Sequence, residues 1–330
     1  MQAILSVTVP FFALVLCGWL AARRRVLPEA AIPGLNAFVL FFALPCMLFR
    51  FGAATPVDKI FNPATVAVYA GAALSIVALT IALTRGPRLH LKDAAFGALV
   101  AAFPNTGFMG IPLMTTLLGA AAAGPMMITL LVDMLLTSSV CLMLVQLHGS
   151  AHLPLGARLR DALRGPLGNP QPWAIVLGAV FSAYGLALPG PLARVVDLLA
   201  QAATPVALFT IGAVLWRAGE HARIEAEAEG GEGRTPWGSF VPVALIKLLV
   251  HPALVFGLGS GAVALGLPLS AFDLTVLTLA AALPSASNVS LLAERHQADN
   301  GRVARVILTS TVLAFGSFSL LAWWLGVGPG

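Results

Sequence analysis

Charged residues are scarce in this chain. Only 10% of its 330 residues are Asp, Glu, Lys or Arg, whereas 58% are hydrophobic, and the mean hydropathy is +0.91. A soluble globular domain carries about 25% charged residues. The composition therefore excludes a soluble domain and predicts an integral membrane protein.

Cysteine is also rare. The three cysteines, Cys17, Cys46 and Cys141, are odd in number and lie far apart within apolar segments. That pattern excludes a disulfide framework and a cysteine metal site, and it is typical of small buried hydrophobic residues. We expect neither a metal nor a cofactor.

The motifs of intramembrane enzymes are missing as well. Such enzymes need paired aspartates, His-Glu-x-x-His or a serine with histidine or lysine, and only Asp133 and Asp273 lie in or near helix cores, without such context. The stretch Gly257-Leu-Gly-Ser-Gly261 lies within an apolar run and lacks the spacing of a nucleophile elbow, so helix packing explains it. We expect no enzyme, and keep an intramembrane enzyme and a channel as alternatives from other classes.

Long apolar runs dominate what is present. Each is about 20 residues long, enough to span a hydrocarbon core of roughly 30 Å as a helix. The first has no basic residue before it and three arginines after it, so it is not expected to be a signal peptide. The sequence thus predicts an all-α integral membrane protein with about ten transmembrane helices, at 4–22, 32–49, 63–83, 94–118, 124–147, 171–188, 195–216, 240–265, 270–293 and 303–327.

Lysine and arginine gather in alternate loops, which predicts the orientation. The same spread over many loops argues against a nucleic-acid partner. We expect a multi-pass membrane protein with both termini outside. The cytoplasmic set would be Arg23, Arg24, Arg25, Arg85, Arg88, Lys92, Arg158, Arg160, Arg164, Arg217, Arg223, Arg234, Arg295, Arg302 and Arg305, and the outer set Arg50, Lys59 and Arg194.

Two of the apolar runs are interrupted. Residues 101–113 read Ala-Ala-Phe-Pro-Asn-Thr-Gly-Phe-Met-Gly-Ile-Pro-Leu, and residues 281–290 read Ala-Ala-Leu-Pro-Ser-Ala-Ser-Asn-Val-Ser. Backbone groups that proline leaves unpaired survive at membrane depth only inside protein or against a cavity. Interrupted segments at matching places of two halves indicate the binding site of a secondary transporter.

The two halves resemble each other. Leu44-Pro45 matches Thr204-Pro205 at an offset of 160, and Pro104 matches Pro284 at an offset of 180. The difference fits a polar cytoplasmic insert at about 217–239, which we interpret as a linker. Residues 1–150 and 151–330 would then each hold five helices, and an odd number makes the second repeat inverted.

Asn105 and Asn288 are the first candidates for substrate binding, because an amide in hydrocarbon is costly unless it is well used. Thr106, Gly107, Ser285 and Ser287 could add hydroxyl contacts or close backbone approach. The half-helices that start at the breaks carry a partial positive charge, which suits an anion. The alternative is that each asparagine only satisfies its own helix break, and that the small residues only pack.

Three ionisable residues lie within the runs. Asp133 could carry a coupled proton, bind a cation or pair with Lys247, and it shares a helix face with Thr137. Lys247 could attract an anion, and His251, four residues on, could titrate near neutral pH. In the alternative, Asp133 and Lys247 form a structural pair, or Lys247 extends to water at the membrane surface.

These motifs resemble a known family. Residues 104–113 and 282–289 are similar to the fourth- and ninth-helix signatures of the auxin efflux carrier family, in its bacterial branch. Further matches are Ala43-Leu44-Pro45, Ile246-Lys247 with His251-Pro252, and Leu308-Thr309-Ser310-Thr311. The resemblance covers nearly the whole chain.

The resemblance implies a five-plus-five inverted repeat with two broken crossover helices, like bile-acid symporters and sodium/proton antiporters. It implies a scaffold of helices 1, 2, 6 and 7, a transport domain of helices 3–5 and 8–10, and a homodimer. Carried onto this chain, the crossover prolines are Pro104 and Pro284 and the substrate-contacting asparagines are Asn105 and Asn288. The second motif has Ser285 where the first has an asparagine after proline, so the half-sites differ.

Bacterial members of this family are carriers of malonate or other small organic acids, and residues 132–139 look most like the malonate-carrier subgroup. We therefore expect a secondary carrier that moves a small carboxylate by an elevator-like or rocking motion. The coupling ion would be H⁺ or Na⁺. The main alternative is a cation-coupled symporter of another organic anion, with Asp133 as the ion ligand.

Overall fold

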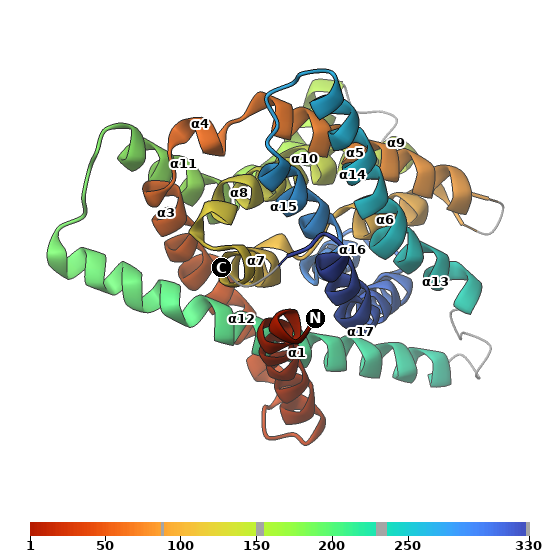
Figure 1. Ribbon diagram of the computed structural model, residues 1–330. Helices are drawn as coiled ribbons and strands as arrows, with labels where there is room; N and C mark the ends of the chain where they lie inside the picture. Colours follow the sequence, from red (N-terminus) through yellow and green to blue (C-terminus); the bar gives the residue numbers. More distant parts are fainter. Residues whose placement is uncertain (87–88, 150–154, 229–235, 328–330) are drawn as a thin grey trace.

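The computed structural model describes residues 1–86, 89–149, 155–228 and 236–327. Helices make up most of this part of the chain, and it contains no strand (Figure 1). The all-helical prediction is therefore confirmed for the described residues.

The helices of residues 1–150 follow the expected apolar runs closely. In chain order they are α1 (Gln2–Arg23), η1 (Glu29–Ala31), α2 (Ile32–Phe38), η2 (Val39–Ala43), α3 (Leu44–Ala54), α4 (Val57–Ile60), α5 (Pro63–Thr84), α6 (Leu91–Ala102), η3 (Thr106–Gly110), α7 (Ile111–Leu118), η4 (Ala120–Ala122), α8 (Ala123–Leu131), η5 (Val132–Thr137) and α9 (Ser138–Gly149).

The remaining helices follow in the second half. They are α10 (Leu155–Leu167), α11 (Pro170–Ala183), α12 (Gly190–Ala228), α13 (Trp237–Leu245), η6 (Ile246–Val250), α14 (His251–Ala264), α15 (Ala271–Ala281), α16 (Asn288–Arg295) and α17 (Asn300–Trp324).

Seven continuous helical stretches of the described chain are long and apolar enough to cross a membrane. They cover seven of the ten expected runs, so a multi-pass membrane protein is supported. The other three runs fall on shorter helices: 94–118 on α6 and α7, 171–188 on α11, and 270–293 on α15 and α16. The count of ten crossings stays a prediction.

The two expected interruptions are present. α6 ends at Ala102 and η3 begins at Thr106, while α15 ends at Ala281 and α16 begins at Asn288. In each gap a proline, Pro104 or Pro284, lacks the N–H that would continue the helical bonds. Proline therefore sets the position of both breaks.

The polar insert differs from the prediction. We expected a linker over 217–239, but α12 continues as a helix to Ala228. The first half of the insert consists mainly of Ala, Glu and Arg, which favour a helix in water, and Glu220 pairs with Arg223 at 2.6 Å. His221 contacts Glu29 at 2.7 Å, which fixes this extension to η1. Residues 229–235 of the insert lie outside the described residues.

Arg302 also differs from the prediction. It was expected in a cytoplasmic loop, but it lies in the first turn of α17 and is only 2% exposed. Its Nε donates to the carbonyl of Ser239 at 2.8 Å and its Nη1 to that of Asp93 at 3.1 Å. Carbonyls of α13 and α6 thus hold the guanidinium inside the protein.

Glycines allow two helix pairs to pack very closely. α1 lies across α12, and α3 packs against α11 (Figure 1). A Cβ at Gly18 or Gly212 would overlap a backbone carbonyl of the other helix, and a Cβ at Gly178 would lie 2.6 Å from the carbonyl oxygen of Phe49. Small residues at such contacts are the usual means of close packing between membrane helices.

Candidate functional site at the crossing of two interrupted helices

The two interruptions meet at one place. The Asn105 N–H donates to the Pro284 carbonyl at 2.8 Å, and the Ala286 N–H donates to the Phe103 carbonyl at 2.9 Å. These bonds place Pro104 opposite Ser285 in an antiparallel bridge. Each break thus satisfies backbone groups of the other, as membrane depth requires.

Side chains from two other elements replace the bond lost in the second broken helix. In a continuous helix, the Ser285 N–H would donate to the Ala281 carbonyl. Here the Ser285 N–H donates to the Ser310 hydroxyl of α17 at 3.1 Å, and the Ala281 carbonyl accepts from the Lys247 Nζ at 2.7 Å. Lys247 and Ser310 therefore hold this break open.

The first broken helix restarts at Asn105. Its backbone carbonyl accepts from Met109 and Gly110 at 3.1 and 2.9 Å, and its side chain makes no cap hydrogen bond. Asn105 is 3% exposed. The structure thus assigns the start of η3 to the Asn105 backbone and leaves its side-chain amide available for another partner.

Asn288 lies beyond the bridge, as the first residue of α16. It is half-buried, and its buried Oδ1 has no hydrogen-bond partner. The register of the bridge places Pro284, and not Asn288, opposite Asn105. The two half-sites are therefore unequal in geometry as well as in sequence.

The small candidate residues surround the crossing and are all buried. Thr106 and Ser285 belong to the paired segments, and Ser287 precedes α16. Among the described residues, the Ser285 hydroxyl has no hydrogen-bond partner. A Cβ at Gly107 would lie 3.4 Å from the Gln171 Oε1, which is ordinary contact, so packing alone does not require glycine there.

Asp133 lies close to this region in a fully buried position. Its Oδ2 accepts from the Tyr69 hydroxyl at 2.9 Å, and its Oδ1 accepts from the Thr137 hydroxyl at 3.4 Å. The shared face of Asp133 and Thr137 is therefore confirmed. Both carboxylate oxygens have a donor, as a buried polar group requires.

Lys247 and His251 are fully buried as well. The Lys247 Nζ lies 3.2 Å from the His251 Nδ1, which confirms their shared face, and the His251 Nε2 has no partner. Because Lys247 is 0% exposed, its extension to water is excluded in this structure. The His251 and Tyr69 rings lie 6.0 Å apart between centroids, so this pair is next to the Asp133 cluster.

No ion pair joins Asp133 and Lys247 within the part of the chain that the structure describes. Tyr69 and His251 connect them instead. We call Tyr69, Asp133, Thr137, Lys247 and His251 the buried polar cluster. Through Lys247 it contacts the second break.

Both charges of the buried polar cluster lie in π-helical turns. Asp133 belongs to η5 and Lys247 to η6. Pro252 lacks an N–H and so disturbs the turn that contains Lys247, whereas in η5 the Ser138 hydroxyl donates to the Met134 carbonyl. Single π-helical turns are frequent at functional sites.

Sequence reasoning missed two residues of this region. Tyr69 is one of only two tyrosines in the chain, and a phenol inside an apolar run is a signal that it has a polar partner. Ser310 was part of a motif match, but its bond to Ser285 spans 25 residues. Neither partner follows from local spacing.

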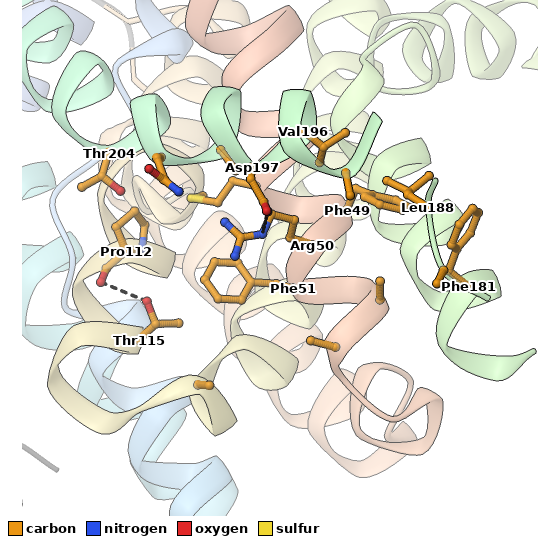
Figure 2. A pocket seen from close by; sticks show the side chains of 18 of the residues that line it. Phe49, Arg50, Phe51, Pro112, Thr115, Phe181, Leu188, Val196, Asp197 and Thr204 are labelled. Carbon is orange, nitrogen blue, oxygen red and sulfur yellow. Dashed lines mark hydrogen bonds and ion pairs between the residues drawn. The ribbon is translucent and has the colours of Figure 1, made fainter. Parts of the chain in front are cut away.

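A separate cavity of about 600 Å³ lies beside the first broken helix (Figure 2). Its walls come from α3, α7, α11 and α12, and Pro112, Thr115 and Thr116 of α7 line one side. The residues predicted for the site lie at the crossing or in the buried polar cluster and not among its lining residues. The Arg50 Nε contacts the Asp197 Oδ1 across it at 2.8 Å.

Comparison with known proteins agrees with this architecture. A family described as "Membrane transport protein" matches residues 3–154 and 157–323. A protein of Rhizobium meliloti (strain 1021) named "Putative malonate transporter" is 28% identical over 330 residues, which cover 99% of this chain and 98% of that protein. An uncharacterized transporter of Methanothermobacter thermautotrophicus is 26% identical over 97% of this chain and 96% of its own.

A third relative is the uncharacterized transporter YfdV of Escherichia coli K12, which is 24% identical over 93% of this chain and 92% of its own. All three relatives carry the name of a transporter, and the family match spans nearly the whole sequence. The chain therefore belongs to the membrane transport protein family, the auxin efflux carrier family that its two broken-helix motifs predicted.

Proposed function

We propose that this protein is a secondary active carrier of a small organic anion, and that malonate is the first substrate to test. The observation that carries the proposal is the crossing of two interrupted helices inside an apolar helical protein. The name of the Rhizobium meliloti relative favours malonate. Asn105 and Asn288 would contact the substrate, together with Thr106, Gly107, Ser285 and Ser287.

An anion fits the charges around the crossing. η3 with α7, and α16, both begin beside it, so the positive ends of two half-helices lie there. The buried Lys247, whose Nζ donates to the Ala281 carbonyl beside the second break, would add a positive charge when it is protonated. A carboxylate could bind the Asn105 amide and the backbone N–H groups of a half-helix start.

We further propose alternating access by motion of helices 3–5 and 8–10 against a scaffold of helices 1, 2, 6 and 7. The packing supports an inverted repeat. The expected helices 1 and 2 correspond to α1 and to α2 with α3, and the expected helices 6 and 7 correspond to α11 and α12. Exchanging the first pair with the second turns the α1–α12 contact into the α11–α3 contact. Exchanging the expected helices 3 and 4 with helices 8 and 9 likewise turns the α5–α6 contact into the α14–α15 contact. A homodimer in the bacterial inner membrane, with both termini outside, completes the proposal.

Asp133 is the proposed coupling residue, for H⁺ or Na⁺. A carboxylate inside a membrane costs about 2.5–3.5 kcal/mol on insertion scales and is a functional hypothesis by default. It contacts the crossing through Tyr69, His251 and Lys247. If Asp133 binds the ion while the crossing takes a different organic anion, the alternative of a cation-coupled symporter holds.

The test is uptake of labelled malonate into proteoliposomes under imposed pH and sodium gradients. Wild type should show saturable uptake, and Asn105→Ala should reduce it at least about tenfold, because a hydrogen bond to a charged group contributes about 1.5–3 kcal/mol. Asn36→Ala removes an amide from α2, which packs mainly on α12, η1 and η2, and should match wild type.

Three outcomes would contradict parts of the proposal. Absence of malonate uptake by folded protein under every gradient would discard malonate, and other organic anions would then be tested. Uptake that never saturates, with measurable current, would indicate a channel. Asp133→Asn should abolish the gradient dependence but retain substrate binding, and unchanged gradient dependence would remove Asp133 from coupling.

A further inference from the structure

The cavity beside α7 contains a charged pair that the crossing does not use. The Arg50 Nε of α3 lies 2.8 Å from the Asp197 Oδ1 of α12 (Figure 2). Within the described part of the chain, this ion pair is the one polar contact of the Arg50 guanidinium. A guanidinium offers five N–H donors in a fork that matches a carboxylate, so most of this donor set is available.

The pair is exposed enough to exchange partners. The Arg50 side chain is 48% exposed and that of Asp197 is 38% exposed. Ion pairs with such exposure are weak because water screens the charges and two long side chains must be held in place. A second carboxylate can therefore compete with Asp197 for Arg50.

The rest of the cavity has the composition of a small-molecule site. Apolar side chains form most of its lining, among them Met47, Phe49, Phe51, Phe181, Leu188 and Val196. Such apolar walls are typical of ligand pockets, in which a few polar groups orient the bound molecule. Gln201, Thr204 and Thr116 add amide and hydroxyl groups that can orient a polar ligand.

The location relates the cavity to the crossing. Arg50 and Asp197 lie on helices of the proposed scaffold, whereas Pro112, Thr115 and Thr116 lie on α7, which continues from the first break. By the distribution of basic residues, this end of α3 and α12 faces outward. A ligand in this cavity would thus contact both proposed domains on the outer side.

We propose that this cavity is an outer binding site for an organic carboxylate, in which the ligand's carboxylate replaces Asp197 on the Arg50 guanidinium. The inference rests on the proposed function. In this site the Arg50 guanidinium attracts and binds the anion. Asp197 competes with the anion for Arg50 and pairs with Arg50 when no ligand is bound. The anion then passes along α7 to the crossing.

The competition gives opposite effects for the two charges of the pair. Arg50→Gln should raise the KM for malonate uptake from outside at least about tenfold, with little change in Vmax, because the charge-assisted bonds are lost. Asp197→Asn should lower that KM by up to about fivefold, the factor that one exposed ion pair accounts for. Arg50→Lys should restore part of the loss, since it keeps the charge without the planar fork.

Arg194→Gln is the matched control. Arg194 lies on the same helix, three residues before Asp197, is exposed and does not line the cavity. It changes the net charge of this surface as Arg50→Gln does, so it should leave KM unchanged. Equal increases in KM for Arg50→Gln and Arg194→Gln would mean that the effect comes from the charge of the outer surface in general, and would overturn the proposal.

Two other results would also overturn it. An unchanged KM in Arg50→Gln would show that the guanidinium does not bind substrate. A KM raised by Asp197→Asn would show that Asp197 supports Arg50 and does not compete with the ligand.

A binding measurement separates this site from transport itself. In a parent lacking Cys17 and Cys46, Gln201→Cys should react with a membrane-impermeant maleimide, and malonate should protect it only while Arg50 is present. If wild type fails to transport malonate, protection is measured with acetate and succinate. Absence of protection by every carboxylate would overturn the outer site, whereas protection without uptake would contradict only malonate transport.

Discussion

At the scale of single residues, the buried polar cluster shows how this chain keeps charges inside an apolar protein. Each carboxylate oxygen of Asp133 accepts a hydrogen bond. The Lys247 Nζ contacts the His251 Nδ1 and donates to the Ala281 carbonyl. A buried charge without such partners would cost several kcal/mol. The cluster therefore gives each of the two ionisable groups its own hydrogen-bond partners rather than one direct ion pair.

Tyr69→Phe should destabilise the protein by about 1–3 kcal/mol and reduce substrate uptake, because the buried Asp133 loses its shorter hydrogen bond. The measurement is thermal unfolding of the detergent-solubilised protein together with uptake in proteoliposomes. Tyr184→Phe is the matched control, since Tyr184 is the other tyrosine and is 77% exposed. Equal melting temperatures for the two variants would contradict a stabilising role of the Tyr69 bond.

Sequence reasoning at this scale reached the residues but not their partners. Helical spacing predicted that Asp133 shares a face with Thr137 and Lys247 with His251. It could not predict the Tyr69–Asp133 bond or the Lys247–Ala281 bond, which join residues 64 and 34 positions apart. Such contacts depend on how helices pack, and no local pattern encodes them.

At the scale of helices, proline and glycine determine the arrangement. Pro104 and Pro284 end α6 and α15 where the sequence predicted, because a missing N–H is a local property. Gly18 and Gly212 allow α1 and α12 to touch backbone to backbone. The helix over residues 217–228 was not predicted, because polar composition was interpreted as a linker although Ala, Glu and Arg favour helix in water.

Gly212→Ala should destabilise the protein by about 1–3 kcal/mol, because the added methyl group would overlap the Val15 carbonyl and push α1 away from α12. Thermal unfolding in detergent measures the change. Gly257→Ala in α14 is the control: a Cβ there meets nothing within 4 Å, so helix propensity predicts no loss or a small gain. If both variants unfold at the wild-type temperature, the close contact is not required.

At the scale of the whole molecule, the sequence predicted a multi-pass helical transporter, and the structure and family match support it. The order of motifs pointed to two halves, and the packing of α1 on α12 and of α11 on α3 is compatible with that division. The inverted repeat stays a prediction. The number of crossings did not follow from length, because interrupted helices are shorter than a membrane-spanning helix.

The proposed topology predicts which positions are accessible from each side. Cysteines introduced at Gln2 and Leu186 should react with an impermeant maleimide added to intact cells, whereas one at Glu220 should react only after permeabilisation. Leu186 and Glu220 flank most of α12 and are at least partly exposed. Labelling of Glu220→Cys in intact cells would contradict the proposed orientation or the five-plus-five arrangement. The parent lacking Cys17 and Cys46 measures the background labelling.

The bonds at the second break also constrain which parts can travel together. If α15 moved alone, the Ala281 carbonyl would lose its bond from Lys247 and the Ser285 N–H would lose its bond to Ser310. Each backbone group left without a hydrogen bond inside the membrane costs several kcal/mol. The least costly displacement therefore carries η6, α15 and α17 as one rigid piece. The second break therefore connects three helices to one another, and the proposed alternating access requires a hinge outside this group of helices.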